Sequence, residues 1–232
     1  MIINATYFKG NIYLPNAKNS ISSTIPDVEN KVLDFIKEYE SDCLFKCFGS
    51  VLFNEFKTKL DDAVTTLIKA GADAKWGLLM NGETYTNPNG DEVVWGGIRR
   101  KTNSLGSSVD GEYDKSFLAQ YVYFYHEKNA HIIRSGAGNK KINSANSVNA
   151  NDNQKVVSAW REFIRHVQGE TDVSPYFVKE GFMGGVGVDY YAGGNGAEVN
   201  LYQFINDKNE LIADTYADFK PKKWTNLNNM SM

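Results

Sequence analysis

The sequence predicts a mainly α-helical protein, a helical bundle with a β-hairpin inserted at about residues 82–98. Apolar residues recur at a period of 3.6 over several long stretches, which is typical of amphipathic helices. Two short segments with strand-like composition flank an Asn-Gly dipeptide, which is typical of a hairpin. Since 42% of the 232 residues are hydrophobic, the chain can build a sizeable core. We therefore expect one domain over residues 1–232.

The first predicted helix begins near Pro26 and ends before Gly49. Thr24 and Asp27 have the spacing of a capping box, and proline is tolerated in the first turn of a helix. Glycine is the usual residue after a helix end. Between these limits the apolar residues follow a helical period, so this segment is a long amphipathic helix in the prediction.

Two shorter helices are expected to follow. Ser50 is a candidate cap for a helix through Phe56, since a serine side chain satisfies free backbone N–H groups there. Asp61 and Asp62 are expected to open a third helix that ends before Gly71, because acidic side chains favour the positive end of the helix dipole. This position explains the two neighbouring carboxylates without acid-base chemistry.

A hairpin is predicted after a short apolar turn at residues 76–79. Its arms are residues 84–86 and 92–95, and Asn89-Gly90 lies in the connection. Both of these residue types accept a positive φ, and Pro88 implies a loop longer than two residues.

Two further helices complete the predicted helical core, which spans residues 24–134 and 152–168. The first starts near Asp114 and has apolar residues on all sides, which indicates burial nearly all round. The second carries an apolar face and has Asp152 or Asn153 as its cap. Between them, residues 135–153 are rich in asparagine and poor in apolar side chains, which is typical of a flexible loop.

The last part of the chain is expected to be mostly irregular. A glycine-rich loop occupies residues 181–197, a short apolar helix residues 200–205, and a C-terminal arm residues 206–232. The arm carries three aromatic anchors, Tyr216, Phe219 and Trp224. We expect the two loops to become ordered against partner chains, because neither has enough apolar area to offset its ordering entropy.

Composition excludes several classes of protein. The net charge of −3 and the pI of about 5.7 give no basic nucleic-acid footprint. No segment has the apolar length of a membrane span or the pattern of a signal peptide. The two cysteines, Cys43 and Cys47, lie four residues apart on one helix face, which favours core packing in a reducing compartment.

Motifs for catalysis or metal binding are weak. The three histidines, His126, His131 and His166, lack the four-residue spacing of two ligands on one helix face, so the sequence predicts no catalytic residue, metal ligand or cofactor. Residues 184–189 match the GGxGxD calcium nonapeptide, and a second copy follows with Glu198 for the aspartate. The alternative hypothesis is thus a small enzyme or calcium-dependent binding module that uses residues 184–201.

In that alternative, three acidic residues would carry the chemistry: Asp172, Asp189 and Glu198. A parallel β-roll needs three or more repeats, and two copies are present. The glycine-rich segment is therefore expected to be a surface loop.

Aromatic residues make up 13% of the chain, and Tyr and Trp are common at subunit contacts. Tyr121, Tyr123 and Tyr125 alternate around a predicted helix, so some of them are expected to face away from the core. The expected partner-interface residues are Tyr123, Tyr190, Tyr191 and Trp224.

Several packing segments follow one another in a recognisable order. They are FIKEYE at 35–40, LFKCFG at 44–49, LFNEFK at 52–57, KWGLLMNGETY at 75–85, WGGI at 95–98, AQYVYFY at 119–125, KVVSAW at 155–160, NLYQFI at 200–205 and NLNNM at 226–230. This order resembles the head-to-tail connector, or neck ring, proteins of crAss-like tailed bacteriophages. The glycine insertion at 181–197 departs from that pattern and leaves the role of the loop open.

The resemblance implies a structural virion protein and no enzyme. Such a protein forms a closed ring of about twelve copies between the portal and the tail, assembles in the host cytoplasm and contacts the portal and other neck or tail proteins. The genome passes through its channel during packaging and ejection without sequence-specific binding. No membrane partner and no cofactor is implied.

Overall fold

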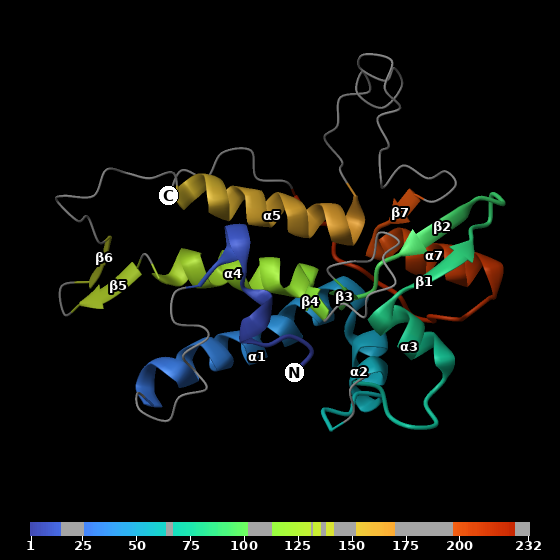
Figure 1. The fold of residues 1–232 in the computed structure, drawn as a ribbon, viewed down its shortest axis with the longest axis horizontal. Helices are drawn as coiled ribbons and strands as arrows, with labels where there is room; N and C mark the ends of the chain where they lie inside the picture. Colours follow the sequence, from blue (N-terminus) through green and yellow to red (C-terminus); the bar gives the residue numbers. More distant parts are fainter. Residues whose placement is uncertain are drawn as a thin grey trace, which may run out of the picture.

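The computed structural model describes residues 1–14, 26–63, 67–101, 113–130, 132–135, 138–141, 152–169 and 197–225. Three long helices form its centre (Figure 1): α1 (Pro26–Phe48), α4 (Phe117–Ala130) and α5 (Asp152–Gln168). Helix α4 packs against both of the others, and seven of its first eight residues are buried. A helix in this position has no solvent face over most of its length, which explains its apolar composition.

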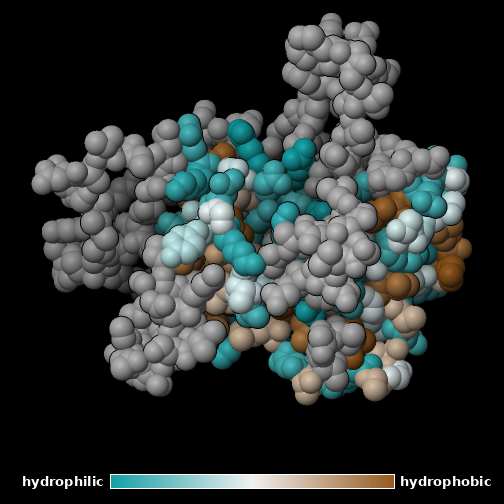
Figure 2. All heavy atoms as spheres, viewed as in Figure 1, coloured by the Kyte–Doolittle hydropathy of each residue, from teal (hydrophilic) through white to brown (hydrophobic). Residues whose placement is uncertain are grey.

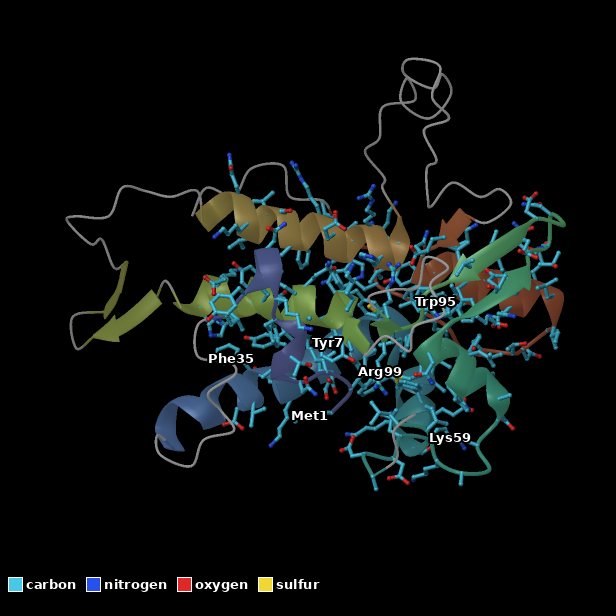
Figure 3. The ribbon with its side chains drawn as sticks, viewed as in Figure 1. Met1, Tyr7, Phe35, Lys59, Trp95 and Arg99 are labelled. Carbon is cyan, nitrogen blue, oxygen red and sulfur yellow. The ribbon has the colours of Figure 1, made fainter. Side chains whose placement is uncertain are left out.

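A small sheet lies beside the helical layer. Strands β1 (Glu83–Thr86) and β2 (Glu92–Trp95) form an antiparallel hairpin, and β7 (Ala197–Val199) pairs with β2 in parallel. Helix α7 (Leu201–Leu211) packs on this sheet: Phe204 stacks on Trp95 with ring centroids 5.2 Å apart. Figure 3 shows Trp95 among the side chains between the hairpin and α7.

Shorter elements connect these two parts. Helices α2 (Ser50–Thr58) and α3 (Ala74–Asn81) lie between the end of α1 and the hairpin. Two further strand pairs are antiparallel: β3 (Arg100–Lys101) with β4 (Tyr113–Lys115), and β5 (Ile132–Ser135) with β6 (Gly138–Lys141).

The N-terminal segment is held on the core by a buried carboxylate. Its two 3-10 turns are η1 (Ala5–Tyr7) and η2 (Gly10–Ile12). Glu40 of α1 accepts the backbone N–H groups of Ile2 at 2.8 Å and Ile3 at 3.0 Å. Burial raises the pKa of Glu40, although these hydrogen bonds oppose the shift. The side chain of Glu40 therefore holds the backbone of residues 2 and 3 in place before η1.

Most of the long predicted elements are confirmed. Helix α1 starts at Pro26, and Gly49 follows its end with a φ of 83°; the proposed cap Thr24 lies outside the described residues. The hairpin and the bounds of α5 are confirmed. Trp76 and Trp160 are buried core residues. Cys43 and Cys47 are also buried, with their Sγ atoms 3.9 Å apart.

The predicted third helix is wrong. Leu60 and Ile68 form an antiparallel bridge, and the N–H of Asp61 donates to the carbonyl of Leu67 at 3.0 Å. Leu67 has a φ of 58°, which a right-handed helix does not allow. Asp62 instead binds the N-terminal ammonium of Met1 at 2.7 Å, so this acidic pair does not open a helix.

Two other local predictions around α2 and α3 need correction. Ser50 is the first helical residue and not the cap, because Gly49 occupies the N-cap position without a side-chain hydrogen bond. Residues 76–79 belong to helix α3 and do not form a turn. Burial of Trp76, Leu79 and Met80 on one side of α3 stabilises this short helix despite Gly77.

The later loops also contain more regular structure than predicted. Residues 132–134 belong to β5 and not to the helical core, and 138–141 of the Asn-rich loop form β6. In the C-terminal arm, α7 extends to Leu211. Tyr216 and Trp224 are buried, as expected for anchors, and Phe219 is partly buried. The glycine-rich stretch lies outside the described residues up to 196.

Among the described residues, none of the helices is both long enough and apolar enough to cross a bilayer.

Candidate functional site

A cavity of about 540 Å³ lies where the N-terminal segment meets the first turn of α4 and the middle and C-terminal part of α5. Hydrophilic side chains gather over α5 on the face shown in Figure 2. The cavity is lined by Tyr7, Lys9, Gly10, Asn11, Ile12, Arg100, Lys115, Ser116, Phe117, Gln120, Ser158, Ala159, Glu162 and His166. These residues come from segments far apart in the sequence, so the fold creates the site.

The N-terminal wall of the cavity is anchored through Tyr7. Its hydroxyl accepts a hydrogen bond from Nε of Arg99 at 3.4 Å, and the two labelled side chains lie near the middle of the molecule in Figure 3. Tyr7 is buried, which fixes the approach of η2 to α4 and α5.

Arg100 is the central side chain of an ion-paired network at one end of the cavity. Its Nη1 lies 2.7 Å from Oε1 of Glu198, and its Nη2 donates to Oε2 at 2.8 Å. This bidentate geometry is the strong form of the Arg-carboxylate pair. It joins β3 to β7, and so ties the strand pair β3–β4 to the sheet.

His166 of α5 completes the network. Nη1 of Arg100 lies 3.0 Å from its Nε2, and its Nδ1 lies 2.7 Å from the carbonyl oxygen of Glu162. Because a guanidinium only donates, Nε2 accepts and Nδ1 carries the hydrogen that is donated to Glu162. The side chain is therefore held as the neutral Nδ1–H tautomer.

The ionisation of His166 follows from this environment. Burial, and then the positive charge of Arg100, lower its pKa to about 4. Burial also raises the pKa of Glu198, although Arg100 opposes the shift. At neutral pH the network contains one guanidinium, one carboxylate and a neutral imidazole. Arg100 thus pairs with both Glu198 and His166, while its Nε atom is buried and has no hydrogen-bond partner among the described residues.

Gly96 makes the Arg100–Glu198 pair possible. A Cβ at this position would lie 2.7 Å from Oε1 of Glu198 and 2.8 Å from Nε of Arg100. We expect Gly96→Ala to separate the pair and to lower the free energy of unfolding by about 1–3 kcal/mol, since a partly buried charge loses its partner. Urea unfolding measures this change.

Gly77 provides the matched control for this prediction. It lies within α3, and a Cβ there would have no neighbour within 4 Å. Gly77→Ala should raise stability by about 0.5–1 kcal/mol through helix propensity. Equal effects of the two substitutions would contradict the steric role of Gly96.

The residues expected at a partner interface are differently placed. Tyr123 and Trp224 are buried within this chain, at 5% and 4% exposure, and their place at a partner interface stays a prediction. Trp224 packs on Trp160 and Phe163, and its Nε1 donates to the hydroxyl of Tyr202 at 2.8 Å. Tyr190 and Tyr191 lie outside the described residues.

The calcium hypothesis finds no support in the described part of residues 184–201. Glu198 is paired with Arg100, and the side chain of Asn200 accepts the N–H of Gln203 as the cap of α7. Asp172 and Asp189 lie outside the described residues. Among the residues that the structure describes, no three His, Cys, Asp or Glu side chains form a group that could hold a metal ion.

Sequence reasoning missed the Arg100 network for a physical reason. Arg100 is 66 residues from His166 and 98 residues from Glu198, so no local spacing connects them. The one local signal is the Gly96-Gly97 pair before Arg100, which indicates a close approach of other groups to the backbone.

Comparison with known proteins gives no relatives: no family model, curated protein or solved structure matches this chain.

Proposed function

We propose that this chain is a structural subunit of a ring in the neck of a tailed bacteriophage, where it joins the portal to the tail. The observation that carries the proposal is the position of the segments on which the family resemblance rests. Those that fall in described residues contribute buried side chains to α1, α2, α3, α4, α5, α7 and the hairpin. The resemblance thus concerns the folded core of the protein.

The ionisable groups of the cavity also favour a structural role. The carboxylate of Glu198 and the guanidinium of Arg100 neutralise each other, and His166 is neutral with both ring nitrogens engaged. An enzyme needs an acid, base or nucleophile free to meet substrate. The proposal therefore includes no enzymatic activity.

Two separate apolar surfaces are available for subunit contacts. Phe45 and Val51 are exposed near the junction of α1 and α2, at 47% and 54%. Leu211 and Ile212 are exposed at the end of α7, at 45% and 70%. A ring of identical subunits is built from head-to-tail contacts between two different surfaces, and these two surfaces meet that requirement.

The proposed assembly is a cyclic homo-oligomer of twelve copies in the virion neck, in contact with the portal protein and other neck or tail proteins. The genome would pass through the ring, and the net charge of −3 avoids the tight phosphate binding that a basic lining produces. Because the portal can serve as a template for ring assembly, the test uses purified neck complexes.

Native mass spectrometry and cryo-microscopy of the neck complex test the proposal. Twelve copies of the 26.0 kDa chain contribute about 312 kDa. Ile212→Glu should abolish incorporation while the melting temperature stays the same, because the side chain is 70% exposed. Lys37→Glu, an exposed change on α1 outside both apolar surfaces, is the control. A single copy per neck, or absence from the virion, would refute the proposal.

A further inference from the structure

The cavity beside Arg100 has the size and the construction of a ligand site. Its volume of about 540 Å³ lies within the range of small-ligand pockets. Three walls that differ in chemistry surround it: the N-terminal turn at Gly10–Ile12, the start of α4 and the inner edge of α5. The volume admits a side chain together with adjoining backbone.

The charge around the cavity is positive, although the chain as a whole carries −3. Lys9, Arg100 and Lys115 line it, against one carboxylate, Glu162, which pairs with Arg165 at 3.2 Å. Arg100 is already engaged by Glu198. Lys115 is exposed and forms no ion pair with another described residue. A negatively charged group is therefore favoured beside Lys115.

A second, independent observation points to a ligand that also donates a hydrogen bond. The Oε1 atom of Gln120 is buried and has no hydrogen-bond partner among the described residues. A buried acceptor without a donor is costly, and Gln120 lines the cavity. A simple carboxylate or phosphate dianion offers no donor, whereas a peptide carries N–H groups beside its acidic side chains.

Part of the remaining lining is apolar, although Asn11, Ser116 and Ser158 add polar groups to it. Ile12, Phe117 and Ala159 contribute to the walls, and Phe117 and Ala159 are buried in the core. A peptide with an apolar residue next to an acidic one matches this combination, and a nucleic-acid backbone does not.

We propose that this cavity binds an acidic peptide segment of a partner protein. A carboxylate of the peptide pairs with Lys115, a backbone N–H donates to Oε1 of Gln120, and an apolar side chain packs against Phe117. The proposal stands on the cavity alone and does not depend on ring assembly. The Arg100–Glu198 pair and His166 form the rigid end of the site.

The test uses the full chain and two acetylated, amidated peptides, Gly-Glu-Leu-Glu-Gly and Gly-Gln-Leu-Gln-Gly. NMR titration should show shifts at the cavity residues, with binding of the Glu peptide about tenfold tighter than that of the Gln peptide. Lys115→Gln should lower the affinity of the protein for the Glu peptide by about tenfold. Lys155→Gln, an exposed change on α5 outside the cavity lining, should leave the affinity unchanged.

Gln120→Met separates binding from folding. Methionine keeps the side-chain length but removes the acceptor, so peptide affinity should fall while the melting temperature stays level or rises. Equal affinity for the two peptides, or no shift at the cavity residues with the Glu peptide, would overturn the proposal. Binding of a DNA duplex at Lys115 in place of the peptide would also overturn it and would identify a phosphate site.

Discussion

Replacement of Trp160 by alanine is expected to lower the free energy of unfolding by about 3–5 kcal/mol, the range for loss of a buried aromatic side chain. Trp160 is 6% exposed. Its ring centroid lies 4.4 Å from that of Phe124 and 5.2 Å from that of Phe163. Its Nε1 also donates to the carbonyl of Thr225 at 3.1 Å, so the substitution opens a cavity and leaves that carbonyl without a partner.

Urea unfolding of the isolated chain measures this effect. Trp160→Phe keeps part of the ring contacts and should lose less stability than the alanine variant. Arg161→Ala, at the exposed neighbouring position, should stay within about 0.5 kcal/mol of the parent. An alanine variant with an unchanged unfolding midpoint would contradict the packing of α5 on α4. Because the fold is lost first, any loss of assembly in this variant would be secondary.

The long helices were predictable because their signals are local. In α5 the apolar residues recur at helical spacing, as expected for the predicted apolar face. Val156, Trp160, Phe163, Ile164 and Val167 are buried, and Val157 is partly buried. The period of the sequence thus determined both the element and its orientation.

The short elements were not predictable in the same way. Helix α3 depends on burial against other parts of the chain, because Trp76 packs on Phe56 and Tyr216. Tertiary contacts of this kind override local propensity. Similarly, β7 pairs with β2 about a hundred residues earlier, and no local pattern indicates such a parallel pair.

Aromatic content did not distinguish the core from an interface. Tyr121, with a relative exposure of 0%, donates to Asp42 at 2.6 Å and packs on Trp224. Burial raises the pKa of the Tyr121 hydroxyl, and the hydrogen bond to Asp42 adds to this effect. Tyr and Trp have both an apolar body and a polar end, so they suit a buried cluster with hydrogen-bond partners as well as a subunit contact.

The stability of the protein is expected to fall as the pH drops from 6.5 to 4, because of His166. Its pKa is about 4 in the folded chain, against an ordinary value of 6.5. Between these values the unfolded chain binds a proton that the folded chain does not, so stability rises with pH across this window and is lost as pH falls through it. The slope is at most about 1.4 kcal/mol per pH unit, so the total over this window is on the order of 3 kcal/mol.

The groups around His166 explain why protonation is unfavourable in the folded state. Nε2 of His166 already accepts a hydrogen bond from Nη1 of Arg100. Arg165 and Lys115 add positive charge nearby. Glu162 offers its backbone carbonyl to Nδ1, while its side chain pairs with Arg165. A proton on Nε2 would face the guanidinium directly, and the hydrogen bond to Arg100 would be lost.

His166→Gln provides the comparison, since glutamine does not titrate in this range and keeps an acceptor for Arg100. Urea unfolding at pH 4.5, 5.5 and 7 should show a smaller decrease in stability toward acid pH for the variant than for the parent chain. The carboxyl groups of Glu40 and Glu198, whose pKa values burial raises, act in the opposite direction in both proteins, because their protonated forms favour the folded state. The difference between the two pH profiles therefore isolates His166. Parallel profiles would mean that the imidazole accepts a proton in the folded chain as readily as in the unfolded one, and that the Arg100 contact does not hold it neutral.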